Sequence, residues 1–148
     1  MDKSIATSPN FVLHVHQETE IRATAPVVFE SILDQAGPGM TLQDGTPMPL
    51  RLEAWPGGRW YRDLGNNTGH LWGHVQVIKP PTLLELYGPM FMSYAAISHV
   101  QYRVTEKGNV SVLALTHRAI GEISPEHREG VTRGWNKLLA NIKARAQR

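Results

Sequence analysis

The chain has 148 residues, a formal net charge of +2 and no cysteine. This length suits one hydrophobic core, and we expect residues 1–148 to form a single domain. The lack of cysteine excludes disulfides and thiolate chemistry, and the small charge, without runs of like sign, argues against nucleic-acid binding. No stretch is long and apolar enough for a membrane span, and Met1–Asn10 lacks the apolar centre of a signal peptide, so the sequence predicts a cytoplasmic protein.

The first third of the chain predicts a strand, a short helix and a loop. Apolar and polar residues alternate over Phe11–Glu20, which is typical of a half-buried strand. A helical pattern begins at Ala25 and ends before the breaker Gly37-Pro38-Gly39. Met40–Pro49 is rich in Gly, Pro, Asp and Thr, so we expect a loop there with at most one helical turn.

From Leu50 onwards, the pattern predicts short strands joined by tight turns. The turns contain glycine, asparagine and proline, which adopt the backbone angles that chain reversals need. The predicted strands are Leu50–Trp55, Arg59–Leu64, His70–Lys79, Leu83–Tyr87, Ile97–Thr105 and Val110–Ala119. Met90–Tyr94 follows a Gly-Pro pair and can be either a bulged continuation of a strand or a loop.

The last stretch, Ser124–Arg148, predicts one long helix. Ser124 is a favourable N-cap, and a proline follows it at the first helical position. Helical spacing gathers one apolar stripe, made of Val131, Trp135, Leu138, Leu139 and Ile142. Lys137 and the basic residues after it are expected on a solvated face, where they complement the helix dipole rather than form an anion site.

Two glycines, Gly130 and Gly134, lie one turn apart inside this helix, where each costs about 1 kcal/mol relative to alanine. They can let the helix backbone approach a sheet closely, or they can leave room beside Trp135 for a bound molecule. We expect Gly134→Leu to be worse tolerated than Arg133→Leu, because Gly134 should face packing and Arg133 should face water.

The order of elements predicts the fold class. Strands in series joined by tight turns cannot form βαβ units, so the sheet must be mainly antiparallel. We therefore expect an α+β fold with a curved sheet of about seven strands wrapped on the long C-terminal helix, and one or two short helices after the first strand. A single helix of about 10 Å diameter cannot fill the concave side of such a sheet, so the arrangement predicts a hollow.

Four motifs carry a resemblance to a known family. They are Ile21–Phe29, Trp55–Asp63, Gly69–Pro81, and Gly134-Trp135 followed by Leu138. In this order they resemble the START-like (SRPBCC), helix-grip superfamily, and within it the branch named after the activator of the Hsp90 ATPase. The resemblance implies an internal cavity, which in the superfamily holds lipids, hormones, polyketides or other apolar molecules. No catalytic residues are shared across the superfamily, so it implies none here.

Large aromatic and thioether side chains are the candidate ligand contacts. The predicted ligand-binding residues are Trp55, Trp60, Trp72, Tyr87, Met90, Met92, Tyr102, Trp135 and Leu138. Apolar ligand sites use large side chains with a polar tip and adaptable methionines. Ordinary core packing is the better explanation for any one of these residues taken alone. As a set, with glycines opposite them on the helix, they favour a site.

The histidines raise the question of a metal site. His14 and His16 share one face of a strand, about 7 Å apart between Cα atoms, and His117 is the only plausible third ligand. The other interpretation places histidines on a solvated sheet face beside Glu18 and Glu20. We adopt the second interpretation and expect neither a metal nor a cofactor.

Acid/base chemistry would need a titratable group facing the hollow. The candidates in predicted strands are His70, His74, His99, His117 and Glu85. His70 and His74 alternate in step with Trp72, whereas Leu71 and Val75 occupy the opposite and equally apolar face. The sequence leaves open which of these two faces is the inner one.

We therefore expect a domain that binds a small hydrophobic or aromatic molecule between the sheet and the C-terminal helix. One alternative is an enzyme of cyclase, hydratase or hydrolase type that uses the same hollow. Another is a co-chaperone-like interaction module or a homodimer, which predicts an exposed apolar patch on the outer sheet face.

Overall fold

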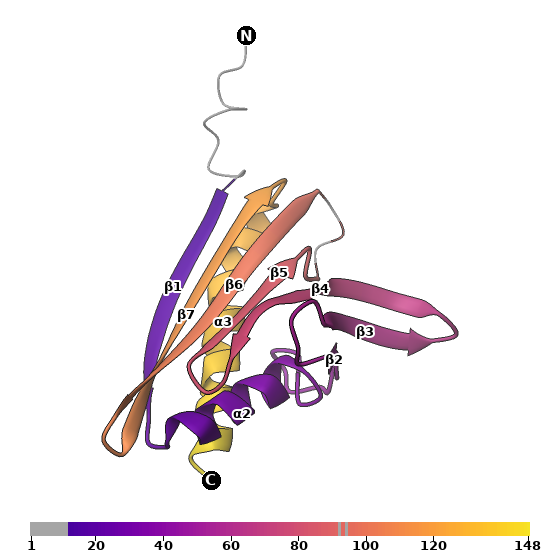
Figure 1. The fold of residues 1–148 in the computed structure, drawn as a ribbon. Helices are drawn as coiled ribbons and strands as arrows, with labels where there is room; N and C mark the ends of the chain where they lie inside the picture. Colours follow the sequence, from indigo (N-terminus) through magenta and orange to yellow (C-terminus); the bar gives the residue numbers. More distant parts are fainter. Residues whose placement is uncertain (1–11, 92, 94) are drawn as a thin grey trace.

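A computed structural model describes residues 12–91, 93 and 95–148 of the chain. Its elements, in chain order, are β1 (Val12–Ile21), α2 (Ala25–Ala36), β2 (Arg51–Leu52), β3 (Arg59–Gly65), β4 (Thr68–Lys79), β5 (Leu83–Gly88), β6 (Ala96–Lys107), β7 (Val110–Gly121) and α3 (Pro125–Ala146) (Figure 1). Predictions made for Met1–Asn10, Phe11, Met92 and Tyr94 concern residues outside the described ranges.

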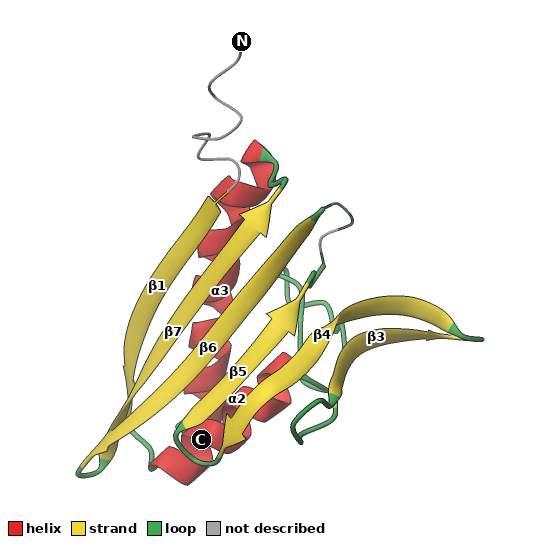
Figure 2. Ribbon diagram, turned by 45° about the horizontal axis from the view of Figure 1, so that its top comes forward, coloured by secondary structure: helices red, strands yellow, loops and turns green. Residues whose placement is uncertain are grey.

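The seven strands form one antiparallel sheet in the order β1-β7-β6-β5-β4-β3-β2. The first strand joins the sheet beside the last one, with Val12 opposite Ile120 and Ile21 opposite Ser111. Figure 2 shows that both helices lie on one side of the curved sheet, with α3 running along it. The predicted α+β helix-grip architecture is confirmed.

Strict alternation in β1, β6 and β7 fixes which face is the inner one. Leu13 and Val15 are buried on β1, and Val100 and Tyr102 are buried on β6, while residues between them are more exposed. Because side chains alternate along a strand, the neighbours of these residues point to the outer face. His14 and His16 therefore lie on the outer face, as the solvated-face interpretation expects.

The strand β4 does not alternate strictly. Register shifts interrupt its pairing with β3 near Trp60 and its pairing with β5 near Val75. An extra residue in one strand reverses the side-chain phase after it. As a result Trp72 and Val75 are both buried, whereas Leu71 is exposed. Strict alternation would place Trp72 on one face and both Leu71 and Val75 on the other, so the inner face of β4 combines residues from both sets.

The strand predicted over Leu50–Trp55 is wrong in extent, because β2 ends at Leu52. The chain turns away at this point since the Glu53 carboxylate accepts the Arg59 N–H at 2.7 Å. The following glycines then pair with β4, where the Gly57 N–H donates to the Val75 carbonyl at 2.8 Å. Met90 and the residue after it form a turn rather than a continued strand.

The helix α3 begins as predicted and is anchored at its far end. The Ser124 hydroxyl caps it by accepting the His127 N–H at 3.1 Å. Near its C-terminus, Arg145 lies 3.2 Å from the Asp34 carboxylate and donates to the Ser31 hydroxyl at 2.9 Å, which ties α3 to α2. Among the described residues, no helix combines the length and hydropathy needed to cross a bilayer.

Candidate functional site

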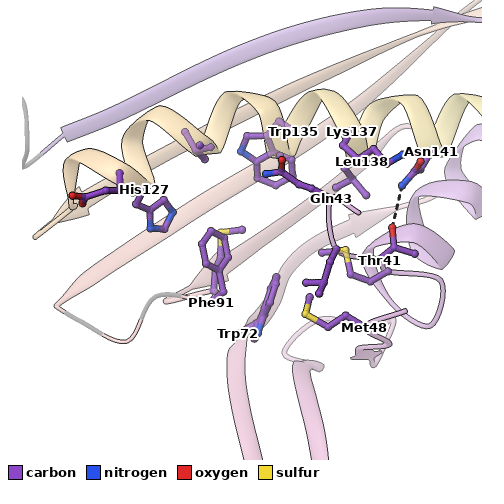
Figure 3. A pocket seen from close by; sticks show the side chains of 17 residues that line it. Thr41, Gln43, Met48, Trp72, Phe91, His127, Trp135, Lys137, Leu138 and Asn141 are labelled. Atoms are coloured by element: carbon purple, nitrogen blue, oxygen red, sulfur yellow. Dashed lines mark hydrogen bonds between the residues drawn. The ribbon is translucent and has the colours of Figure 1, made fainter. Parts of the chain in front are cut away.

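A cavity of about 520 Å³ runs along α3 (Figure 3). Three segments wall it: the loop between α2 and β2, the turn that follows β5 together with Trp72 of β4, and the first four turns of α3. Most of its wall is apolar, and its thioether and aliphatic members are Met40, Leu42, Met48, Met90, Val131 and Leu138. The predicted hollow between sheet and helix therefore exists and extends under the loop.

An aromatic row forms one end of the cavity. Trp72 lies edge-on to Trp60, with ring centroids 5.2 Å apart, and contacts Phe91 at 5.6 Å. Phe91 in turn stacks on His127 of α3, with centroids 4.5 Å apart and planes 22° from parallel. The Trp60 indole donates to the Ala36 carbonyl at 2.8 Å, so this row is anchored to the end of α2.

The turn at Met90 brings Phe91 into this row. Met90 has a φ of 58°, in the left-handed region that side chains other than glycine rarely adopt. Its N–H donates to the Trp72 carbonyl at 2.8 Å, which holds the turn against β4. The chain therefore leaves the sheet after β5 and places an aromatic ring between the sheet and α3.

Trp135 forms part of the wall and is held from behind by a buried hydrogen-bond chain. Its indole N–H donates to His117 Nδ1 at 2.9 Å, and His117 Nε2 lies 2.8 Å from the Ser98 hydroxyl. Because an indole N–H can only donate, Nδ1 must be the acceptor, and the imidazole proton is on Nε2. The chain fixes both the tautomer of His117 and the orientation of the indole.

His117 is neutral in this position. Its side chain is fully buried, and this burial, with a smaller effect from nearby His127, lowers the pKa of His117 to about 4. Burial also lowers the pKa of His127, which lines the cavity directly. Both imidazoles are therefore uncharged at neutral pH, and the aromatic end of the cavity carries no cationic histidine.

Gly130 and Gly134 face open space rather than the sheet. Among the described residues, a Cβ at Gly130 would have only the Arg133 guanidinium within 4 Å, at 3.9 Å, and a Cβ at Gly134 only the Gln43 amide, at 3.8 Å. Both glycines line the cavity. The geometry therefore favours the interpretation that they leave room beside Trp135, and not that they admit a close helix–sheet contact.

Polar side chains gather at the opposite end of the cavity from the aromatic row (Figure 3). Asn141 donates to the Thr41 hydroxyl at 3.3 Å, which joins α3 to the loop. Lys137 also lines the cavity, and Gln43 lies between the two ends, with its amide over Gly134 and beside Trp135 (Figure 3). Lys137, expected only on a solvated face, thus borders the cavity, although its side chain is exposed.

The predicted ligand-binding residues do not all lie at the cavity. Trp72, Met90, Trp135 and Leu138 line the cavity, whereas Trp60 and Tyr102 are buried in the core behind it. The Tyr102 hydroxyl has no hydrogen-bond partner within the described part of the chain, and burial raises its pKa. Met92 lies outside the described residues.

Trp55 and Tyr87 are not at the cavity. Trp55 is 57% exposed because it lies in the turn where the predicted strand ends. Tyr87 is 42% exposed because it pairs with His99 on the outer face of the sheet, where its ring also approaches His74 at 5.9 Å. These two aromatic residues cannot contact a molecule bound in the cavity.

Sequence reasoning missed the loop and His127. The loop supplies five lining residues, which are Met40, Thr41, Leu42, Gln43 and Met48. The available signal was the presence of large apolar side chains within a segment otherwise rich in turn-forming residues. His127 was overlooked because it lies in the first turn of α3, before the apolar stripe begins.

The histidines do not meet at one point. His16 lies on the outer face, bonded to the Thr116 hydroxyl at 2.8 Å and to Glu18 at 3.1 Å, while His117 points inward from β7. The sheet therefore separates the proposed third ligand from the first two. Across residues 12–91, 93 and 95–148, no three His, Cys, Asp or Glu side chains are placed to hold a metal ion.

Of the acid/base candidates named from the sequence, His117 alone is fully buried, and Trp135 lies between it and the cavity. His99 and Glu85 lie 3.4 Å apart on the outer face, and His70 is exposed. His127, which stacks on Phe91, and its neighbour Glu126 are titratable side chains that line the cavity beside the aromatic row. Both come from the helix rather than from the sheet.

The outer face of the sheet carries a short apolar row at one end. Ile120 of β7 is paired with Val12 of β1 on one side and with Ile97 of β6 on the other. All three are exposed. This is the kind of patch that the interaction-module alternative predicts, although it is only three side chains long.

Residues 22–147 match the model of the family described as activator of Hsp90 ATPase homolog 1-like protein. The chain belongs to this family. No curated protein matches it. The family assignment and the helix-grip fold agree with the resemblance seen in the four sequence motifs.

Solved structures support the fold at low sequence identity. CalU16 from Micromonospora echinospora is 19% identical, with a TM-score of 0.64 over 90% of this chain and 75% of that one. Ara h 8.0201 is 11% identical, with a TM-score of 0.68 over 91% of this chain and 97% of that one. The di-domain ARO/CYC protein BexL is 14% identical, with a TM-score of 0.64, and the match covers 98% of this chain and 53% of BexL.

Proposed function

We propose that this protein binds a small hydrophobic or aromatic molecule in the cavity between α3, β4 and the loop that precedes β2. The observation that supports this most directly is the cavity of about 520 Å³, walled by tryptophan, phenylalanine and methionine and left open by two glycines. Ligand pockets usually measure about 300–1,000 Å³ and combine an apolar wall with a few polar groups.

Burial of apolar ligand surface would drive binding. Such burial contributes about 25 cal/mol per Å², offset by the loss of translational and rotational freedom and by the ordering of side chains. Trp135 is already held by His117, and Trp72 is packed between Trp60 and Phe91, so few rings need to be ordered. A preorganised wall of this kind favours affinity.

Two of the similar structures are described as belonging to biosynthetic pathways, which is compatible with a small-molecule site. BexL is described as a di-domain ARO/CYC protein from the BE-7585A biosynthetic pathway. A structure of DynU16, described as a putative protein in the dynemicin biosynthetic locus, also shares the fold, with a TM-score of 0.65. Proteins with this fold therefore occur in the biosynthesis of small molecules.

The test uses N-phenyl-1-naphthylamine, a neutral probe whose fluorescence rises in apolar sites. We expect saturable binding and a raised melting temperature, since a ligand at 100 times its Kd adds about 2.7 kcal/mol. Gly134→Leu should fill the cavity and abolish binding, whereas Asn136→Leu, at an exposed position on the same helix, should leave it unchanged. If the wild type binds neither this probe nor any member of a lipophilic panel, the proposal is wrong.

A second candidate function is catalysis at the same site. It is favoured by His127, an imidazole that lines the cavity, stacks on Phe91 and is neutral because burial lowers its pKa. A neutral imidazole can accept a proton from a bound molecule. This candidate predicts that a captured compound is chemically changed and that His127→Gln keeps binding but stops the change. Recovery of captured compounds unaltered, judged by mass spectrometry, would exclude it.

A further inference from the structure

The formal charges in the cavity wall lie far apart. Among its lining residues, Glu126 and Lys137 are the two that carry a full charge at neutral pH, since His127 is neutral. They are separated by eleven positions on α3, which corresponds to about 16 Å along the helix axis. The aromatic row stands near Glu126, whereas Lys137 lies towards the other end of the cavity (Figure 3). The Arg133 guanidinium does not line the cavity, but it lies 3.9 Å from where a Cβ of Gly130 would be.

The Lys137 ammonium is not neutralised by the protein itself. In the described part of the chain, no carboxylate lies within ion-pair distance of Lys137. Arg145, two turns further along the helix, is instead paired with Asp34 and Glu30. Within the described residues, Arg145, which anchors α3 to α2, is therefore paired, whereas Lys137, which borders the cavity, is not.

Further hydrogen-bond donors lie beside Lys137. Asn141 is four positions later on α3, on the same side of the helix, and its amide donates to Thr41 at 3.3 Å with a second N–H to spare. The Gln43 amide nitrogen lies over Gly134, which is three positions before Lys137. An ammonium with two amide groups nearby is a suitable partner for an acceptor group that carries negative charge.

We propose that the molecule bound in this cavity is an amphipathic aromatic anion. Its ring system would lie among Trp72, Phe91 and Trp135, and its carboxylate or sulfonate would lie at Lys137 and Asn141. This inference rests on the proposed function and specifies the chemical class of the ligand. Repulsion by Glu126 would disfavour the reverse orientation, so the same charges that attract the ligand also orient it.

The helix dipole does not oppose this arrangement. The negative end of the dipole is at the C-terminus of α3, at Ala146, nine positions beyond Lys137. Its influence falls off within the last turn of a helix. The charge that an anion would meet at Lys137 is therefore that of the side chain.

The experiment compares two probes that differ by one group. 1-Anilinonaphthalene-8-sulfonate has the ring system of N-phenyl-1-naphthylamine with an added sulfonate. We expect Lys137→Met to weaken sulfonate-probe binding roughly three- to tenfold and to change neutral-probe binding by less than about twofold. Lys137→Arg should retain most of the sulfonate affinity, because it keeps the charge.

Two controls make the comparison specific. Lys143→Met removes the same charge from α3 at a position outside the cavity, and it should leave the ratio of the two affinities unchanged. Gly134→Leu should abolish binding of both probes, which shows that both occupy the cavity. Raising the salt concentration should weaken the sulfonate probe in the wild type more than in Lys137→Met.

The outcomes separate this inference from the proposed function. If both probes bind in the cavity and Lys137→Met lowers their affinities equally, or lowers neither, the ligand class is wrong while the binding function stands. If Lys143→Met has the same effect as Lys137→Met, the sulfonate responds to net charge alone and the inference is also wrong. If neither probe binds, the proposed function fails, and the inference fails with it.

Discussion

The two halves of α3 have the same apolar periodicity but different surroundings. In the C-terminal half, Ile142 is fully buried and Arg145 is bonded to α2, so this half anchors the helix. In the N-terminal half, Val131 and Trp135 border a cavity whose wall continues just past the midpoint to Leu138, and both helix glycines occur in this half. The difference shows that an apolar stripe identifies the side of a helix that faces the protein interior. Glycines on the same helix identify the part that borders a cavity rather than a packed core.

Core truncations should separate the two halves most clearly. Ile142→Ala removes a fully buried side chain and leaves a new void, so we expect a loss of about 3–4 kcal/mol in the free energy of unfolding. Leu138→Ala enlarges a space that already exists, and we expect a loss of about 2 kcal/mol or less. Urea denaturation measures both, and equal losses would mean that the cavity half is packed as tightly as the anchor.

Acid should destabilise the cavity wall through His117. An unfolded histidine binds a proton near pH 6.5, whereas burial holds the pKa of His117 at about 4 in the folded protein. The unfolded state therefore binds more protons in this interval, so stability is full above pH 6.5 and is lost as the pH falls towards 4. The difference between the two pKa values corresponds to a loss of at most about 3 kcal/mol in the free energy of unfolding.

The control for this prediction is His117→Gln, which cannot titrate. The difference in unfolding free energy between wild type and variant isolates His117 from the carboxylates that titrate in the same range. This difference in unfolding free energy should shrink as the pH falls from 6.5 to 4, because the wild type loses stability through His117 in this range and the variant does not. A difference that stays constant over this range would show that His117 is not held neutral by burial.

Much of the fold could be predicted because local patterns determine it. Alternation identified β1, β6 and β7, and helical spacing with the Ser124 cap identified α3. The inner face of β4 could not be predicted, because the register shifts in its pairing depend on the neighbouring strands and leave no periodic signal. The early end of β2 depends likewise on a contact between Glu53 and Arg59, which no propensity reveals.

The candidate site could be predicted only in part for a related reason. Periodicity shows which residues of a helix face inward, and Trp135 and Leu138 were identified in this way. Trp72 could be named only as a large aromatic side chain, because the sequence leaves the inner face of its strand open. Periodicity does not show which inward residues meet a space and which meet one another, so Trp60 could not be distinguished from Trp72. The loop contribution depends on how 40–48 folds over α3, which is a long-range contact without a sequence pattern.

The smallest expected effects are those of substituting the two helix glycines. They test whether the N-terminal half of α3 borders open space or packs closely on the sheet. Within the part of the chain that the structure describes, a Cβ at Gly130 or Gly134 would meet nothing closer than 3.8 Å, so each alanine variant should gain helix propensity without a clash. We expect Gly130→Ala and Gly134→Ala each to raise the free energy of unfolding by up to about 1 kcal/mol, measured by urea denaturation. A helix that approached the sheet through its glycines would be destabilised by both changes, and Gly134→Leu would then be worse than Arg133→Leu. With the cavity beside it, Gly134→Leu should instead fold as stably as Arg133→Leu and lose only its capacity to bind the probe.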